Sequence, residues 1–95
     1  MIEELSGDFF QQLRGFYYTA QTGGLRKAAH FMNRNPSTIS WQIRQLEQEL
    51  GVVLFDRYKK SLRITPEGER LLAWTISTFE LLRGMKSDVS SPSGV

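Results

Sequence analysis

One predicted helix, at about residues 36–49, carries most of the side chains that are suited to recognition chemistry. Serine hydroxyls, an indole, a guanidinium and side-chain amides recur on one of its faces, among them Ser40, Trp41 and Arg44. These groups are uncharged or positive, and each can donate a hydrogen bond. We interpret this segment as a helix that packs by one face and recognises a surface with the other.

The sequence offers no comparable arrangement for catalysis or for metal binding. It contains no cysteine, which excludes a thiol nucleophile, a disulfide and a cysteine zinc site. No pair of carboxylates lies beside a histidine, and the single histidine, His30, cannot build a metal cluster alone. No glycine-rich loop of the phosphate-cradling kind is present. We therefore expect neither an enzyme nor a bound cofactor.

The helix that carries the polar face has clear signals at both ends. Asn35 is a preferred N-cap residue whose side-chain oxygen can accept a first-turn amide, and Pro36 suits the first helical position. Gly51 follows the last turn, as is common at a helix end. Between these residues an apolar stripe recurs at helical spacing: Ile39, Ile43, Leu46 and Leu50.

Two further helices are predicted before it. The first covers about residues 8–21, and Asp8 with Gln11 resembles a capping box at its start. The second covers about residues 25–32, and a three-residue turn separates it from Pro36. This is the layout of a helix-turn-helix, whose second helix enters the DNA major groove. Two helices that meet at a corner without contacting DNA use similar turns, so the pattern alone leaves both interpretations open.

A small β-hairpin is predicted after Gly51. Residues 52–55 are apolar and begin with two β-branched valines, and residues 62–65 alternate between apolar and polar side chains. The polar loop between them, residues 56–61, carries three cations: Arg57, Lys59 and Lys60. A basic hairpin after a helix-turn-helix is a wing, whose cations suit the phosphate backbone or the minor groove. A solvated turn is the alternative.

The charge distribution agrees with a polyanionic partner. The net charge is only +2, but eight basic and three acidic residues lie between Arg26 and Arg63. Arg26 and Lys27 fall in the first turn of the second helix, where a docked phosphate would be favoured by the helix N-terminus. Ordinary solvated charges explain the same distribution equally well.

A long final helix is predicted from Pro66 to about Lys86, with Thr65 as its cap. Leu72, Ile76 and Phe79 form one apolar stripe, which we expect to pack on the first helix. A second stripe has no evident partner within the chain: Leu71, Trp74, Thr78, Leu81, Leu82 and Met85. We expect this stripe to form a homodimer interface. The alternative is that the first helix covers both stripes.

The chain divides into four expected regions. Residues 1–7 form a lead-in, 8–65 the winged helix-turn-helix, 66–86 the linker helix and 87–95 a flexible linker or tail. The apolar runs are too short to span a membrane, and the acidic start lacks a signal-peptide pattern. We therefore expect a cytoplasmic protein.

Short motifs extend in order from about residue 13 to residue 85. They are Leu13-Arg14, Phe16, Gly23, Ala28-Ala29, Ile39-Ser40, Gln42-Ile43, Leu46-Glu47, Glu49-Leu50-Gly51, Leu54-Phe55-Asp56-Arg57 and Leu62-Arg63-Ile64-Thr65-Pro66-Glu67-Gly68. Together they resemble the N-terminal DNA-binding domain of bacterial LysR-type transcriptional regulators. The resemblance implies a mainly α fold, in which three helices and a two-stranded wing precede a long dimerising helix. It also implies a dyad-symmetric DNA site, a missing effector-sensing domain and, in the full-length protein, a possible tetramer.

The recognition helix departs from the family pattern. Pro36 and Trp41 stand where family members usually carry a glutamine and an arginine that often contact DNA, so base preference cannot be carried over. Arg57 matches the arginine that the family places in or beside the minor groove.

The position of each residue then gives two sets of candidate DNA contacts. We expect base contacts from Pro36, Ser37, Thr38, Ser40, Trp41 and Arg44. We expect phosphate or minor-groove contacts from Arg26, Lys27, Arg34, Asn35, Arg57, Lys59 and Lys60. A protein-interaction module that uses Trp41, Tyr58 and the spare stripe is the alternative function.

Overall fold

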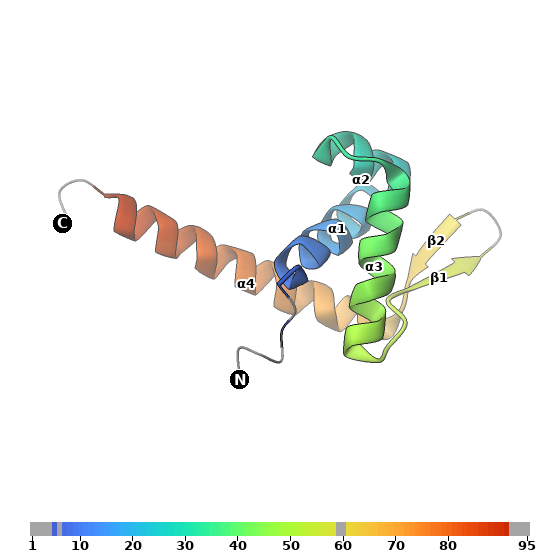
Figure 1. The fold of residues 1–95 in the computed structure, drawn as a ribbon. Coiled ribbons are helices and arrows are strands. Elements are labelled where there is room, and N and C mark those ends of the chain that lie inside the picture. The colour runs from blue at the N-terminus through green and yellow to red at the C-terminus, as the bar shows by residue number, and fades with distance from the viewer. Residues whose placement is uncertain (1–4, 6, 59–60, 92–95) are drawn as a thin grey trace.

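The structure, a computed structural model, describes residues 5, 7–58 and 61–91 of the 95-residue chain. Its elements follow the order α1 (Phe9–Thr22), α2 (Leu25–Met32), α3 (Pro36–Leu50), β1 (Phe55–Tyr58), β2 (Ser61–Ile64) and α4 (Pro66–Ser90). Figure 1 shows α1, α2 and α3 grouped together, the hairpin beside α3, and α4 extending away as a long rod. This is the predicted mainly α winged helix-turn-helix with a long C-terminal helix.

The three helices of the helix-turn-helix pack around one small core. Phe16 of α1, Ile39 and Leu46 of α3, and Leu54 before β1 are completely buried. Ala28 and Ala29 of α2 are also buried, and their small side chains allow close approach by the neighbouring helices. The apolar stripe predicted for α3 therefore faces the core, except that Leu50 at its end is exposed.

Two predicted helix caps are wrong in their chemistry. Asp8 and Asn35 occupy the N-cap positions of α1 and α3, but neither side chain forms a cap hydrogen bond. Asp8 lacks the extended backbone that is typical of an N-cap. At Asn35, the backbone carbonyl already accepts the Thr38 N–H at 3.0 Å. Gln11, the expected capping-box partner, instead accepts a hydrogen bond from Arg14.

The strands of the wing are displaced from their predicted positions. Residues 52–54 are not a strand, and β1 instead covers Phe55–Tyr58, most of which we expected in the loop. It pairs antiparallel with β2, in a register that places Phe55 opposite Ile64 and Arg57 opposite Leu62. The shift arises because Leu54 is buried and its backbone N–H and C=O bond to Glu47 and Thr65 rather than to a strand partner. Lys59 and Lys60 lie outside the described residues.

The final helix begins as predicted but ends later. The Thr65 hydroxyl accepts the Gly68 N–H at 2.9 Å, so Thr65 caps α4. The helix continues to Ser90 instead of ending near Lys86, because no proline or glycine interrupts residues 87–90. Ser91, which precedes Pro92, has the extended backbone that proline imposes on its neighbour.

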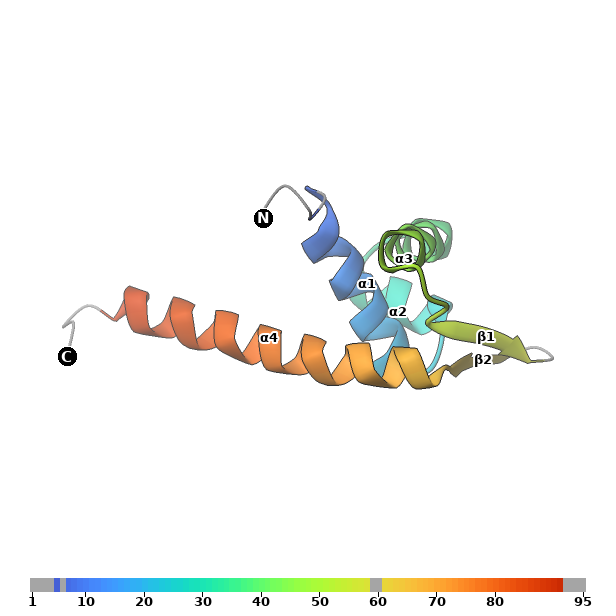
Figure 2. The ribbon, with the colours of Figure 1, turned by 90° about the horizontal axis from the view of Figure 1, so that it is seen from below.

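The apolar residues of α4 divide differently from the two predicted stripes. Leu71 joins Leu72 and Phe79 in packing against the core, whereas Ile76 is 36% exposed. The Phe79 ring contacts Phe10 and Tyr17 of α1. The second half of α4 extends beyond α1 (Figure 2), so α1 does not cover both stripes. Within the described part of the chain, no helix is both long and apolar enough to cross a bilayer.

Candidate nucleic-acid interface

The polar face of α3 is open to solvent. Trp41 is 50% exposed, Ser37 and Arg44 are exposed, and Ser40 is half-buried. The opposite side of the same helix is anchored in the core by the buried isoleucines and Leu46. A firmly packed helix thus presents an uncovered row of hydrogen-bonding side chains, which is what contact with base edges in a groove requires.

The remaining candidate contacts of the helix-turn-helix lie around this row. Pro36 and Asn35 are exposed at the start of α3, and Thr38 is half-buried in its first turn. Arg34 is exposed in the turn before α3. The described candidates for base contact therefore extend from the N-terminus of α3 to its middle.

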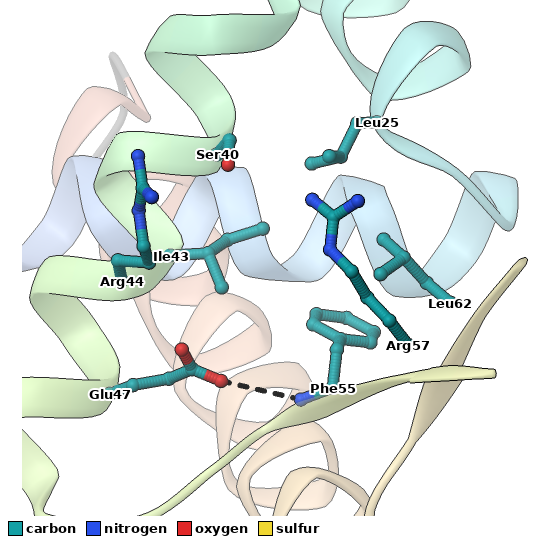
Figure 3. A pocket seen from close by; sticks show the side chains of 8 residues that line it. All are labelled: Leu25, Ser40, Ile43, Arg44, Glu47, Phe55, Arg57 and Leu62. Atoms are coloured by element: carbon teal, nitrogen blue, oxygen red, sulfur yellow. Dashed lines mark hydrogen bonds between the residues drawn. The ribbon is translucent and has the colours of Figure 1, made fainter. Parts of the chain in front are cut away.

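The wing brings a second group of side chains beside α3. A pocket of about 220 Å³ lies between them, lined by Leu25, Ser40, Ile43, Arg44, Glu47, Phe55, Arg57 and Leu62. In Figure 3, Arg57 extends from β1 towards Leu25, and Arg44 rises from α3 on the other side. The structure therefore brings Ser40, Arg44 and Arg57, which are separated in the sequence, to one pocket.

Arg26 and Lys27 lie apart from this pocket. Both are exposed in the first turn of α2, which contains no acidic residue. They line a shallow hollow of about 510 Å³ together with Thr22, His30 and Phe31. Their position at a helix N-terminus suits a phosphate.

Glu47, which the sequence pattern does not single out as a DNA contact, also lines the pocket. Its carboxylate accepts hydrogen bonds from the backbone of the segment that enters the wing. A signal was present in the sequence, because an acidic residue in the last turn of a helix opposes the helix dipole and needs a local reason. Among the described residues, no group of three acidic, histidine or cysteine side chains is arranged to hold a metal ion.

The exposed side of α4 carries the candidate dimer contacts. Trp74 is 73% exposed and Leu81 is 75% exposed, and Met85 and Leu82 are also exposed. The Thr78 hydroxyl bonds to the Trp74 carbonyl within the helix. Leu71, by contrast, packs against the core of its own chain. Trp74, Leu81 and Met85 are thus left largely uncovered by the described part of their own chain.

Comparisons with known proteins identify relatives of this arrangement. Residues 10–69 match the family described as bacterial regulatory helix-turn-helix protein, lysR family. An uncharacterised HTH-type transcriptional regulator, y4mQ of Sinorhizobium fredii, is 39% identical over 79 residues, which cover 83% of this chain and 26% of that protein. The chain thus spans about a quarter of that relative's length.

DNA-binding domains whose structures were solved in complex with DNA share the fold of this chain. The DNA-binding domain of BenM bound to catB site 1 DNA superimposes with a TM-score of 0.84 and 27% identity, covering 90% of this chain and 96% of that one. The DNA-binding domain of CbnR in a DNA complex gives a TM-score of 0.78 and 30% identity, covering 90% and 98%.

Proposed function

Because the chain belongs to the LysR family of bacterial helix-turn-helix regulators, we propose that it acts as a homodimer that recognises a dyad-symmetric double-stranded DNA site. The observation that carries the DNA-binding part of this proposal is the shared pocket of α3 and the wing, where Ser40, Arg44 and Arg57 meet. In this arrangement the recognition helix, α3, and the wing formed by β1 and β2 contact the same DNA duplex. The BenM and CbnR domains share this fold and were solved in complex with DNA, which supports the DNA-binding part of the proposal.

In this proposal α3 enters the major groove and supplies the base contacts. Ser37 and Ser40 each give or accept one hydrogen bond, and Arg44 offers a planar donor fork. Trp41 offers one N–H donor and a large apolar face, which packs on thymine methyl groups or on sugar. We expect less dependence on guanine at this position than an arginine would give. Pro36 and Thr38 contact the same groove from the first turn.

The cations around α3 bind the sugar-phosphate backbone. Arg57 contacts a phosphate or the minor groove from β1, and Arg26 with Lys27 binds a phosphate at the N-terminus of α2. Arg34 and Asn35 contact the backbone beside the start of α3. Lys59 and Lys60 are included on the grounds of sequence alone. These contacts determine affinity and its dependence on salt, whereas sequence preference comes from α3.

The exposed stripe of α4 is the proposed dimer interface. Trp74, Leu81 and Met85 would lose their solvent exposure against the same stripe of a second copy, with Thr78 and Leu82 at its edges. Leu71 would contribute least, since its own core already covers part of it. Two-fold symmetry places the two copies of α3 about 34 Å apart along the DNA, or a multiple of that distance.

The full-length regulator has further expected properties that come from the family. We propose that an effector-sensing domain follows α4 there, and that dimers associate into tetramers. The cytoplasm, where bacterial DNA resides, is the compartment in which this function operates.

Selection from a randomised double-stranded DNA library, at a stated salt concentration, tests the proposal. We expect enrichment of a site with two inverted half-sites, and an affinity that falls steeply as salt concentration rises, because cations released from the phosphates favour binding at low salt. A protein-interaction module with an apolar interface would show neither an enriched DNA site nor a steep fall of affinity with salt. Failure to enrich any sequence, together with salt-independent binding, would refute the DNA-binding function.

A further inference from the structure

We infer that Glu47 is a positioning residue for the wing. Its carboxylate attaches the chain that enters β1 to the recognition helix, and so determines where Arg57 meets DNA. This inference rests on the proposed DNA-binding function, and adds to it a residue that acts through Arg57 rather than by touching DNA.

Glu47 accepts hydrogen bonds from backbone N–H groups at both ends of the segment that connects α3 to β1. Its Oε2 atom accepts the Leu54 N–H at 2.7 Å and the Phe55 N–H at 3.4 Å, and Figure 3 shows the latter bond. Its backbone carbonyl accepts the N–H groups of Gly51 at 2.8 Å and Val52 at 3.2 Å. Four backbone amides of the connection from α3 to β1 therefore bond to this one residue.

The wing needs such an attachment because the hairpin is small. Two strands of four residues are marginally stable on their own, so other contacts must hold them in place. Leu54 supplies the anchor: its side chain is completely buried, its N–H bonds to Glu47, and its C=O accepts the Thr65 N–H at 2.9 Å. The strand thus begins from a peptide that is bound to α3 on one side and to the start of α4 on the other.

The attachment point is close to Arg57 along the strand. Side chains alternate along a β-strand, so Phe55 and Arg57 point to the same face, and both line the pocket with Glu47. A change in the direction of the chain at Phe55 would therefore move the Arg57 guanidinium relative to Ser40 and Arg44 on α3. No hydrogen bond of Arg57 itself is needed for this effect.

The position of this acid also requires an explanation in electrostatic terms. A carboxylate among cations that face DNA repels phosphate, so its presence there calls for a compensating role. The two backbone amides that donate to the Glu47 carboxylate provide that role. A charged acceptor makes stronger hydrogen bonds than a neutral one. Glutamine at this position would keep an acceptor oxygen and remove the repulsion, whereas alanine would remove the attachment.

A double-mutant cycle tests the inference with a mixed-sequence DNA duplex and with the duplex obtained by library selection. We expect Glu47→Ala to weaken binding about tenfold, comparable to the loss of one charged hydrogen bond, and to lower the salt slope by about one. In the Arg57→Ala background, Glu47→Ala should cause no further loss. Glu47→Gln should bind as tightly as the unchanged chain or more tightly. Glu49→Ala, which removes the same charge from an exposed position of the same helix, should lose no affinity in either background.

Circular dichroism first confirms that each variant is folded. The inference is overturned if folded Glu47→Ala binds with unchanged affinity, if its loss is the same with and without Arg57, or if Glu47→Gln loses as much as Glu47→Ala. A residue that merely stabilised the fold would cause the same loss of affinity with and without Arg57, because its effect would not depend on Arg57.

Amide hydrogen exchange without DNA separates this inference from the proposed function. We expect the Leu54 and Phe55 amides to exchange faster in Glu47→Ala than in the unchanged chain, while the amides of α1 keep their protection. If the unchanged chain binds no DNA, the proposed function fails, yet faster exchange would still show the attachment of the wing by Glu47. Unchanged exchange at both amides would refute that attachment whatever the chain binds.

Discussion

The Thr65 hydroxyl accepts a hydrogen bond from the Gly68 N–H at 2.9 Å and so caps the first turn of α4. The same hydroxyl donates to the Val53 carbonyl at 2.6 Å, and Thr65 is buried. Thr65 therefore serves both as the cap of α4 and as a connection to the start of the wing. Its loss should affect two elements together.

Thr65→Ala should lower the free energy of unfolding by about 1–2 kcal/mol, because it removes the cap of α4 and the hydrogen bond that the hydroxyl donates to the Val53 carbonyl. Urea denaturation followed by circular dichroism measures this loss. Thr65→Ser keeps the hydroxyl and serves as the control, with a smaller loss expected. Equal losses for the two variants would show that the methyl group, not the hydroxyl, is responsible.

Gly68→Ala should destabilise the protein although alanine is the better helix former. A Cβ at this position would lie 2.6 Å from Ile64 Cγ1 and closer still to the Leu54 carbonyl oxygen. Overpacking of this kind costs about 1–3 kcal/mol, which outweighs the gain of about 1 kcal/mol in helix propensity. Thermal unfolding provides the measurement.

Gly84→Ala is the matched control for that substitution, since Gly84 lies in the same helix and a Cβ there would meet nothing within 4 Å. It should stabilise the protein by about 0.5–1 kcal/mol. If both alanine variants were stabilising, the close approach of Gly68 to Leu54 would not constrain the protein.

Trp41→Arg should change the preferred DNA sequence. Trp41 is 50% exposed on the face of α3 that we assign to the major groove, and a guanidinium there can form two hydrogen bonds with guanine O6 and N7. Library selection should therefore return more guanine at one position of each half-site. Trp41→Phe, which keeps an apolar ring, should keep the original preference. An identical selected sequence for Trp41→Arg would contradict the assigned role.

Leu81→Glu should shift the protein from dimer towards monomer. Leu81 is 75% exposed in the middle of the apolar stripe of α4, and a carboxylate buried there against its own symmetry mate would be desolvated and repelled. Sedimentation equilibrium measures the change in association, and affinity for a site with two half-sites should fall in parallel.

Ala73→Glu introduces the same charge at an exposed position of α4 away from that stripe, so it should leave the dimer intact. A monomeric unchanged chain, or equal effects of the two substitutions, would argue against an interface centred on Leu81.

Local signals in the sequence were sufficient for the positions of the helices. The bounds of α2 and the first residues of α3 and α4 were predicted correctly, because proline, glycine and the Thr65 cap act on their immediate neighbours. The capping chemistry of Asp8 and Asn35 was wrong, since the same side chain is compatible with several local hydrogen-bond patterns. The face of α3 that is exposed followed from its apolar period alone.

The sequence by itself therefore determined the order and type of the helices, the presence of a basic hairpin and the family. The tertiary structure decided where that hairpin begins, that Leu71 faces the core while Ile76 is exposed, and that Glu47 bonds to the entrance of the wing. The physical reason is the separation along the sequence over which each interaction acts. Helix periodicity and end signals depend on residues within a few positions of one another, whereas burial of Leu54 and the bonds to its peptide depend on α3 and α4 packing around it.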